Sequence, residues 1–155
     1  MNQDKNQHEY HVTAWWTSGR SGLAKSDTAP NAIHFSAPPD GLEGNWTAVE
    51  LLLASISGCF TTTFRTVASR SACEFTDVEV TANATIHNVS SSSYFDDIEV
   101  RPTVKITNIE ECDRVLGLLE KAERLCLVAR ALRFPVKFES QVQVIETGQP
   151  LLSDA

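Results

Sequence analysis

The sequence predicts an α+β protein built from short antiparallel strands and two amphipathic helices. Residues 78–82 alternate apolar and polar side chains with the two-residue period of a half-buried strand. Two longer stretches, beginning near Thr47 and Asn108, repeat apolar residues at the helical period. The elements follow the order β-β-β-α-β-β-α-β, with no internal repeat or long linker. We therefore expect a single domain over residues 1–155, with its core at about residues 10–145.

Three strands are expected before residue 36. Apolar residues alternate over residues 10–16, and the turn signal SGRSG separates this strand from a second one near residues 23–25. Residues 33–35, of sequence IHF, form the third strand. The Gly- and Pro-rich loop SAPPDGLEGN then leads to the first helix.

The first helix is predicted to start at Thr47 and to run to about Ser71. Thr47 and Glu50 fit a capping box, in which the two side chains satisfy each other's unpaired backbone N–H groups. Cys59 lies on or beside the apolar stripe of this helix. The stripe consists of Leu52, Ile56, Cys59, Phe60, Thr63 and Val67.

The second half of the chain is expected to be a hairpin, a helix and a last strand. Strands at residues 78–82 and 98–106 flank the loop NVSSSSYFDD. A helix follows Asn108, has two acidic residues in its first turn, and keeps an apolar side as far as Ala129. Pro135 ends it, and residues 136–144 form the final strand.

The net charge of −7 argues against nucleic acid as a partner, because nucleic acid requires clustered Lys and Arg. The N-terminus MNQDKNQHEY lacks the apolar segment of a signal peptide. The apolar run LLLASISGCF has ten residues, too few to cross a bilayer. We therefore expect a cytoplasmic protein with no membrane partner.

Four cysteines stand at positions 59, 73, 112 and 126. They form no C-x-x-C pair and the histidines lie far from them in sequence, so the spacing does not suggest a metal site. In a reducing compartment a structural disulfide framework is also not expected. Cys59 is then either inert core packing or a nucleophile in a dry pocket. Cys73 and Cys112 carry no motif and are interpreted as structural or incidental.

Three segments resemble the OsmC/Ohr family of thiol peroxidases, in the order in which that family has them. TAVELLLASISGCF resembles the start of the family's helix that carries the first cysteine, and AERLCLVARAL resembles its second cysteine segment. TSGRSGLAKSD resembles the arginine turn of the organic hydroperoxide resistance branch. The resemblance covers roughly residues 10–145 and implies an OsmC-like fold.

The resemblance also implies an intertwined homodimer that reduces organic hydroperoxides without a metal or bound cofactor. Cys59 would be the peroxidatic thiol, and Cys126 the resolving thiol that closes a disulfide with it. Arg20 would hold Cys59 as thiolate, and a dithiol or lipoylated protein would be the reductant. The physical chemistry agrees with these roles, because burial raises a thiol's pKa and a buried reactive cysteine needs a nearby cation.

The chain departs from the family pattern where the arginine's partner stands. Family members have a glutamate ten residues before the first cysteine, and this position is Val49 here. Glu50 lies one residue later, as in a related subgroup, and is the candidate carboxylate. Leu127 and Ala48 replace two prolines of the pattern. The departure at Val49 favours an alternative, a non-catalytic dimeric module that binds small molecules or senses redox state. A third interpretation is a structural dimer with inert cysteines.

Overall fold

The computed structural model describes residues 8–37, 44–89 and 92–146, and its strands and helices confirm the predicted α+β class. The chain divides into two compact units, residues 1–51 and residues 52–155. Each unit has its own antiparallel hairpin. The single-domain assignment stays a prediction.

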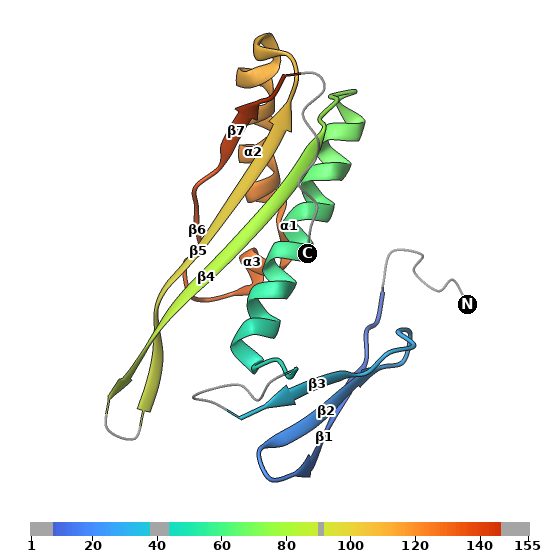
Figure 1. The fold of residues 1–155 in the computed structure, drawn as a ribbon, viewed down its shortest axis with the longest axis vertical. Helices are drawn as coiled ribbons and strands as arrows, with labels where there is room; N and C mark the ends of the chain where they lie inside the picture. The colour runs from blue at the N-terminus through green and yellow to red at the C-terminus, as the bar shows by residue number, and fades with distance from the viewer. Residues whose placement is uncertain (1–7, 38–43, 90–91, 147–155) are drawn as a thin grey trace, which may run out of the picture. The chain divides into compact units, whose positions relative to one another are not determined.

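The first unit contains a three-stranded antiparallel sheet of β1 (Val12–Ser18), β2 (Ser21–Ser26) and β3 (Ile33–Ser36), in chain order (Figure 1). These are the three strands that the sequence predicts. Gly19 turns β1 into β2 with a φ of 54°, which glycine adopts without steric cost.

The first helix, α1 (Ala48–Arg70), also agrees with the prediction, and its capping box is present. Thr47 N donates to Glu50 Oε2 at 2.6 Å, and Glu50 N donates to Thr47 Oγ1 at 3.3 Å. At the other end, Cys73 N donates to Ala68 O, and Ala72 N donates to Ser69 O. This is a Schellman motif, in which the left-handed position is held by Ala72 with a φ of 47°.

Because an alanine occupies a left-handed position, we expect Ala72→Gly to raise the free energy of unfolding by about 1 kcal/mol. Ala54→Gly, at an exposed interior position of α1, is the matched control and should lower it by about 1 kcal/mol. Urea unfolding measures both changes. Equal losses in the two variants would show that position 72 has no special backbone requirement.

The predicted hairpin loop over residues 88–97 is wrong. Strand β4 (Asp77–Val89) pairs with β5 (Ser92–Ile106) along its whole length, up to Val89 opposite Ser92. The polar residues at this end belong to a hairpin with exposed side chains, in which the rings of His87 and Tyr94 stack across the strands at 5.8 Å. Serine-rich sequence signals a turn, but cross-strand pairing continues as far as Val89 and Ser92, with residues 90–91 outside the described part of the chain.

The predicted second helix is broken. A 3₁₀ turn (Ile109–Glu111) leads into α2 (Cys112–Leu125), and a separate short helix α3 (Leu127–Ala131) follows. Cys126 lies between them with an extended backbone (φ −62°, ψ 104°) and no exposed surface. No glycine or proline marks this break, so tertiary packing of Cys126 overrides the local helical pattern.

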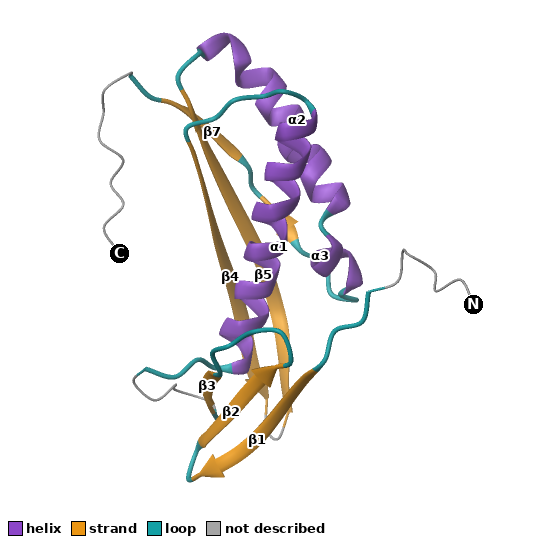
Figure 2. Ribbon diagram, turned by 90° about the vertical axis from the view of Figure 1, so that its right-hand side faces the viewer, coloured by secondary structure: helices purple, strands orange, loops and turns teal. Residues whose placement is uncertain are grey.

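The predicted last strand is two short strands, β6 (Lys137–Phe138) and β7 (Gln141–Val144), both parallel to β5. They pair on either side of Pro102 in β5, which has no N–H to donate to a ladder. Figure 2 shows the helices on one side of this sheet. The core between the two layers includes Phe60, Phe64, Val104, Ile106, Val115 and Leu119.

The helix α1 is longer than the apolar run that excluded a membrane span. It has 23 residues and a mean hydropathy of 1.2, so by length and composition alone it could cross a membrane. The length of the apolar run therefore does not by itself exclude a membrane span. Its buried side chains, Ile56, Phe60, Phe64, Val67 and Ala68, belong to the core, and core helices pass the same test.

Candidate functional site

The structure places Cys59 and Cys126 beside each other in the second unit, where each thiol shifts the pKa of the other. Cys59 is half-buried on α1, and Cys126 is fully buried at the break between α2 and α3. Both cysteines are free thiols, and both contact the same apolar core.

The pKa values of the two thiols are shifted in opposite directions. Burial raises the pKa of Cys59, but hydrogen bonds from the Val128 N–H, the Cys126 thiol, the Leu127 N–H and the Thr63 hydroxyl bring it below its ordinary value. Burial is also the first cause of the raised pKa of Cys126, which its hydrogen bond to Cys59 raises further. Cys59 is therefore the more acidic thiol of the pair.

The break at Cys126 accounts for two of the donors to Cys59. Backbone N–H groups in the first turn of a helix have no partner within that helix. The extended backbone of Cys126 begins a new helix at Leu127, so the N–H groups of Leu127 and Val128 are free to reach the sulfur. A continuous helix would have used both groups in its own backbone ladder.

Thr63 is a donor that the sequence analysis assigned only to the apolar stripe. It lies one turn after Cys59, and its hydroxyl donates its single proton to the Cys59 carbonyl at 2.8 Å, so it reaches the sulfur only by turning away from that carbonyl. Thr61 makes the same type of backbone bond, to the Ser57 carbonyl at 2.8 Å, but does not contribute to the pKa of Cys59.

We therefore expect Thr63→Val to raise the pKa of Cys59 and Thr63→Ser to preserve it. Alkylation by iodoacetamide follows the thiolate, so its rate rises as pH passes through the pKa of Cys59. In Thr63→Val this rise should move to higher pH, whereas Thr61→Val, the matched control, should leave it in place. If both valine variants titrate like the wild type, the Thr63 hydroxyl does not act on the thiolate.

Arg20 and Glu50 lie in the first unit. Arg20 follows Gly19 at the β1–β2 turn, and its Nη2 donates to the Ala37 carbonyl at 2.8 Å. Glu50 is held in the capping box, where hydrogen bonds from the backbone and then the side chain of Thr47 lower its pKa. The helix-capping role of Glu50 is thus confirmed, and the catalytic roles of Arg20 and Glu50 stay predictions.

The other two cysteines, Cys73 and Cys112, pack in the hydrophobic core outside this pair. Cys73 is buried at the end of α1, and burial raises the pKa of its thiol. Cys112 is half-buried in the first turn of α2 and packs against the same core. Over the described residues, no group of three or more His, Cys, Asp or Glu side chains is arranged to hold a metal ion.

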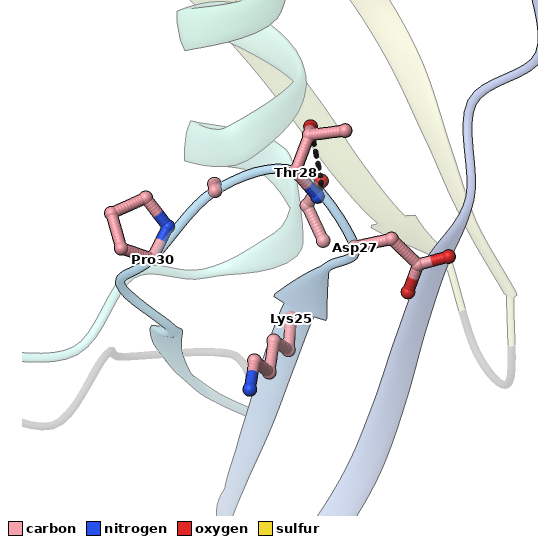
Figure 3. A pocket seen from close by; sticks show the side chains of 6 residues that line it. Lys25, Asp27, Thr28 and Pro30 are labelled. Atoms are coloured by element: carbon pink, nitrogen blue, oxygen red, sulfur yellow. Dashed lines mark hydrogen bonds between the residues drawn. The ribbon is translucent and has the colours of Figure 1, made fainter.

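The first unit also has an open pocket on the loop after β2, shown in Figure 3. Its lining comes from the continuous segment 25–30 and includes Lys25, Asp27 and Pro30. A hydrogen bond between Ser26 and Thr28 holds the loop. The lining has no cysteine or histidine, and thus no nucleophile of the kind that the sequence analysis singled out.

Comparisons with known proteins agree with this fold. The chain is 23% identical over 147 residues to the uncharacterized protein YmaD of Bacillus subtilis (strain 168), covering 92% of this chain and 98% of that protein. An OsmC-like protein of unknown function from Vibrio cholerae O1 biovar eltor str. N16961 superposes with a TM-score of 0.74 at 17% identity, over 86% of this chain and 99% of that one. An organic hydroperoxide resistance protein from Elizabethkingia anophelis superposes with a TM-score of 0.68 at 24% identity, over 91% of this chain and 99% of that one.

A protein-family model provides the assignment. Residues 41–141 match the model described as OsmC-like protein, and this range contains both Cys59 and Cys126. The fold predicted from the three sequence motifs is thereby confirmed. The chain belongs to the OsmC-like protein family.

Proposed function

We propose that this protein is a thiol-dependent peroxidase that reduces organic hydroperoxides. The observation that carries the proposal is the contact between Cys59, whose pKa is lowered, and Cys126, whose pKa is raised. A peroxidase-type role is also supported at the level of the family, since similar structures include the hydroperoxide resistance protein of Elizabethkingia anophelis. We further propose that it acts in the cytoplasm.

The proposed reaction uses the two thiols in sequence. The Cys59 thiolate attacks the terminal oxygen of the hydroperoxide, the O–O bond breaks, and the alcohol leaves after taking a proton. Cys59 is then a sulfenic acid. The sulfur of Cys126 attacks it, its proton joins the departing hydroxide to form water, and a disulfide results. An external dithiol returns both cysteines to thiols.

The active species is proposed to be a homodimer, because the sheet of the first unit has an exposed apolar face. The register of β1, β2 and β3 places Val12, Trp16 and Ile33 on the same face, with exposed fractions of 62%, 58% and 44%. A contiguous apolar surface of this kind is typical of an interface. Light scattering coupled to size-exclusion chromatography of the wild type and Trp16→Glu tests this proposal, with a dimer expected only for the wild type.

The experiment that tests the peroxidase function is stopped-flow oxidation of the reduced protein by cumene hydroperoxide, followed by intact mass measurement. We expect rapid loss of both thiols and a mass decrease of two hydrogen atoms, which corresponds to one disulfide. Hydrogen peroxide should react more slowly, because the surroundings of Cys59 are apolar. Absence of oxidation at millimolar cumene hydroperoxide would contradict the proposal.

Arg20 is proposed to act on Cys59, with Glu50 as the candidate carboxylate nearest in sequence to Val49. We expect Arg20→Ala to raise the pKa of Cys59 and slow peroxide reduction, since each pKa unit corresponds to about 1.4 kcal/mol. Val49→Glu should accelerate it by fixing the arginine. A pH titration of Cys59 alkylation in the wild type, Arg20→Ala and Val49→Glu measures the effect.

Identical titration curves in those three proteins would favour the alternative function, a dimeric module that binds small molecules or senses redox state. The observation that favours this alternative is Val49, which offers no carboxylate to the arginine. Under that outcome the lowered pKa of Cys59 would come entirely from its neighbours in the second unit.

A further inference from the structure

An aromatic ring fills the space that a side chain at Gly22 would take. A Cβ atom built on Gly22 would lie 2.3 Å from Cζ and 2.5 Å from Cε2 of Phe35, closer than real Cβ atoms come to other atoms. Phe35 in β3 stands directly opposite Gly22 in β2, and Gly22 is buried although Ser21 and Leu23 on either side of it are half-buried. The Phe35 ring therefore lies across β2, where a glycine permits this close approach.

This contact stands two residues from Arg20 in the chain. The backbone pairing of β2 with β3 continues beyond the strand ends, because the Ala37 N–H donates to the Arg20 carbonyl at 2.8 Å. The Arg20 side chain bonds to the same residue, since its Nη2 donates to the Ala37 carbonyl at 2.8 Å. Ala37 thus holds both the backbone and the guanidinium group of Arg20.

Strand β3 also holds the residue that precedes the capping box. The Ser36 N–H donates to the Trp46 carbonyl at 2.8 Å. Trp46 is followed by Thr47, whose N–H and hydroxyl both donate to Glu50. The strand therefore bonds to the arginine turn on one side and to the start of the Glu50 segment on the other, so its register bears on the position of both candidate residues.

A strand as short as β3 needs more than its backbone ladder to fix its register. It has four residues, which pair with residues 21–24 of β2. A slip by one residue would turn every side chain of β3 to the other face and take Ala37 away from Arg20. Gly22 is the one glycine of β2, so the Phe35 ring finds room for a seat over the backbone there and at no neighbouring position of that strand.

We propose that Gly22 and Phe35 are positioning residues, which hold β3 in the register that places the Arg20 guanidinium. This rests on the proposed action of Arg20 on Cys59. Neither a glycine nor a phenylalanine supplies an acid, a base or a nucleophile, so both act through the arginine. A methyl group at position 22 must displace the ring or the strand, because it would occupy the place of the ring atoms.

The experiment is a pH titration of Cys59 alkylation in Gly22→Ala, Phe35→Leu and Arg20→Ala. We expect the midpoint to rise in all three, and in the first two by no more than in Arg20→Ala, because a displaced arginine stabilises the thiolate less. Adding Gly22→Ala to Arg20→Ala should then produce no further shift, since changes that act through one group are not additive. A merely structural defect would add its own effect to that of Arg20→Ala.

Ala24→Val is the matched control. Ala24 is the next residue of β2 on the same face as Gly22, stands opposite Ile33, and lies two residues farther along the chain from Arg20. The variant adds apolar bulk to the same sheet face and should leave the Cys59 titration in place. Equal shifts in Gly22→Ala and Ala24→Val would refute the inference, because they would show a general disturbance of this face.

Hydrogen exchange of the Ala37 N–H is a second readout, independent of Cys59. Because this group bonds to the Arg20 carbonyl, its exchange should become faster in Gly22→Ala and Phe35→Leu and stay unchanged in Ala24→Val. Unchanged exchange in Gly22→Ala would show that the ring does not hold the register, and would overturn the inference.

The same set of variants separates this inference from the proposed function. If Arg20→Ala shifts the Cys59 titration and Gly22→Ala does not, Gly22 is not a positioning residue and the role of Arg20 stands. If Arg20→Ala itself leaves the titration in place, the role of Arg20 and the inference both fail. Alkylation and hydrogen exchange need no hydroperoxide, so both readouts decide the inference even in a protein that reduces none.

Discussion

Cys59→Ser is expected to lower hydroperoxide turnover about a thousandfold or more, because serine supplies no anionic nucleophile at neutral pH. The fold should persist, since the side chain is half-buried and the replacement is nearly isosteric. Consumption of cumene hydroperoxide with dithiothreitol as reductant measures the loss, and thermal unfolding checks the fold.

Cys112→Ser is the matched control for this variant. Cys112 is also a half-buried thiol that packs against the same core, but it has no part in the pKa shift of Cys59 or of Cys126. Turnover close to the wild-type value is expected for Cys112→Ser. Full turnover in Cys59→Ser would remove Cys59 from the mechanism, whatever the control shows.

Cys126→Ser is expected to permit one oxidation and no turnover. Without the resolving thiol, Cys59 should stop at the sulfenic acid and then gain a second oxygen to become sulfinic acid. Intact mass after one and after many equivalents of hydroperoxide distinguishes the two products. Because position 126 is fully buried, a serine hydroxyl there costs about 1–3 kcal/mol if it is left without a partner, so Cys126→Ala serves as a second variant.

Cys73→Ser provides the comparison for a buried cysteine outside the pair. Its unfolding free energy should fall in the same way as that of Cys126→Ser, but disulfide formation should be unaffected. Continued turnover of Cys126→Ser with a single-thiol reductant such as glutathione would assign resolution to an external thiol. Continued turnover with dithiothreitol and no disulfide would lead to the same conclusion.

The sequence predicted those parts of the fold that local chemistry determines. The capping box of Thr47 and Glu50 located the start of α1, and alternation located the three strands of the first unit. The break at Cys126 could not be predicted in this way, since no residue at that point disfavours a helix. It arises from the packing of a buried side chain. The extended hairpin and the division of the last strand likewise depend on pairing between distant residues.

The candidate site, like the fold, could be predicted only in part from the sequence. Resemblance to a family pointed to Cys59 and Cys126, and the structure places the two thiols in contact. The resemblance to the family assigned the stabilisation of the thiolate to Arg20, which is far from Cys59 in sequence. The groups that lower its pKa are the N–H groups of Val128 and Leu127, the Cys126 thiol and the Thr63 hydroxyl. Backbone donors leave no trace in residue identity, so no motif could have indicated them.

The break at Cys126 affects how the site tolerates mutation. A backbone N–H is supplied by every residue except proline, so positions 127 and 128 can change identity without removing the donors that face Cys59. Genetic screens for loss of thiol reactivity should therefore recover few substitutions there apart from proline. They should instead recover changes elsewhere that let α2 and α3 merge, since a merged helix would withdraw both donors without altering any residue that touches the sulfur.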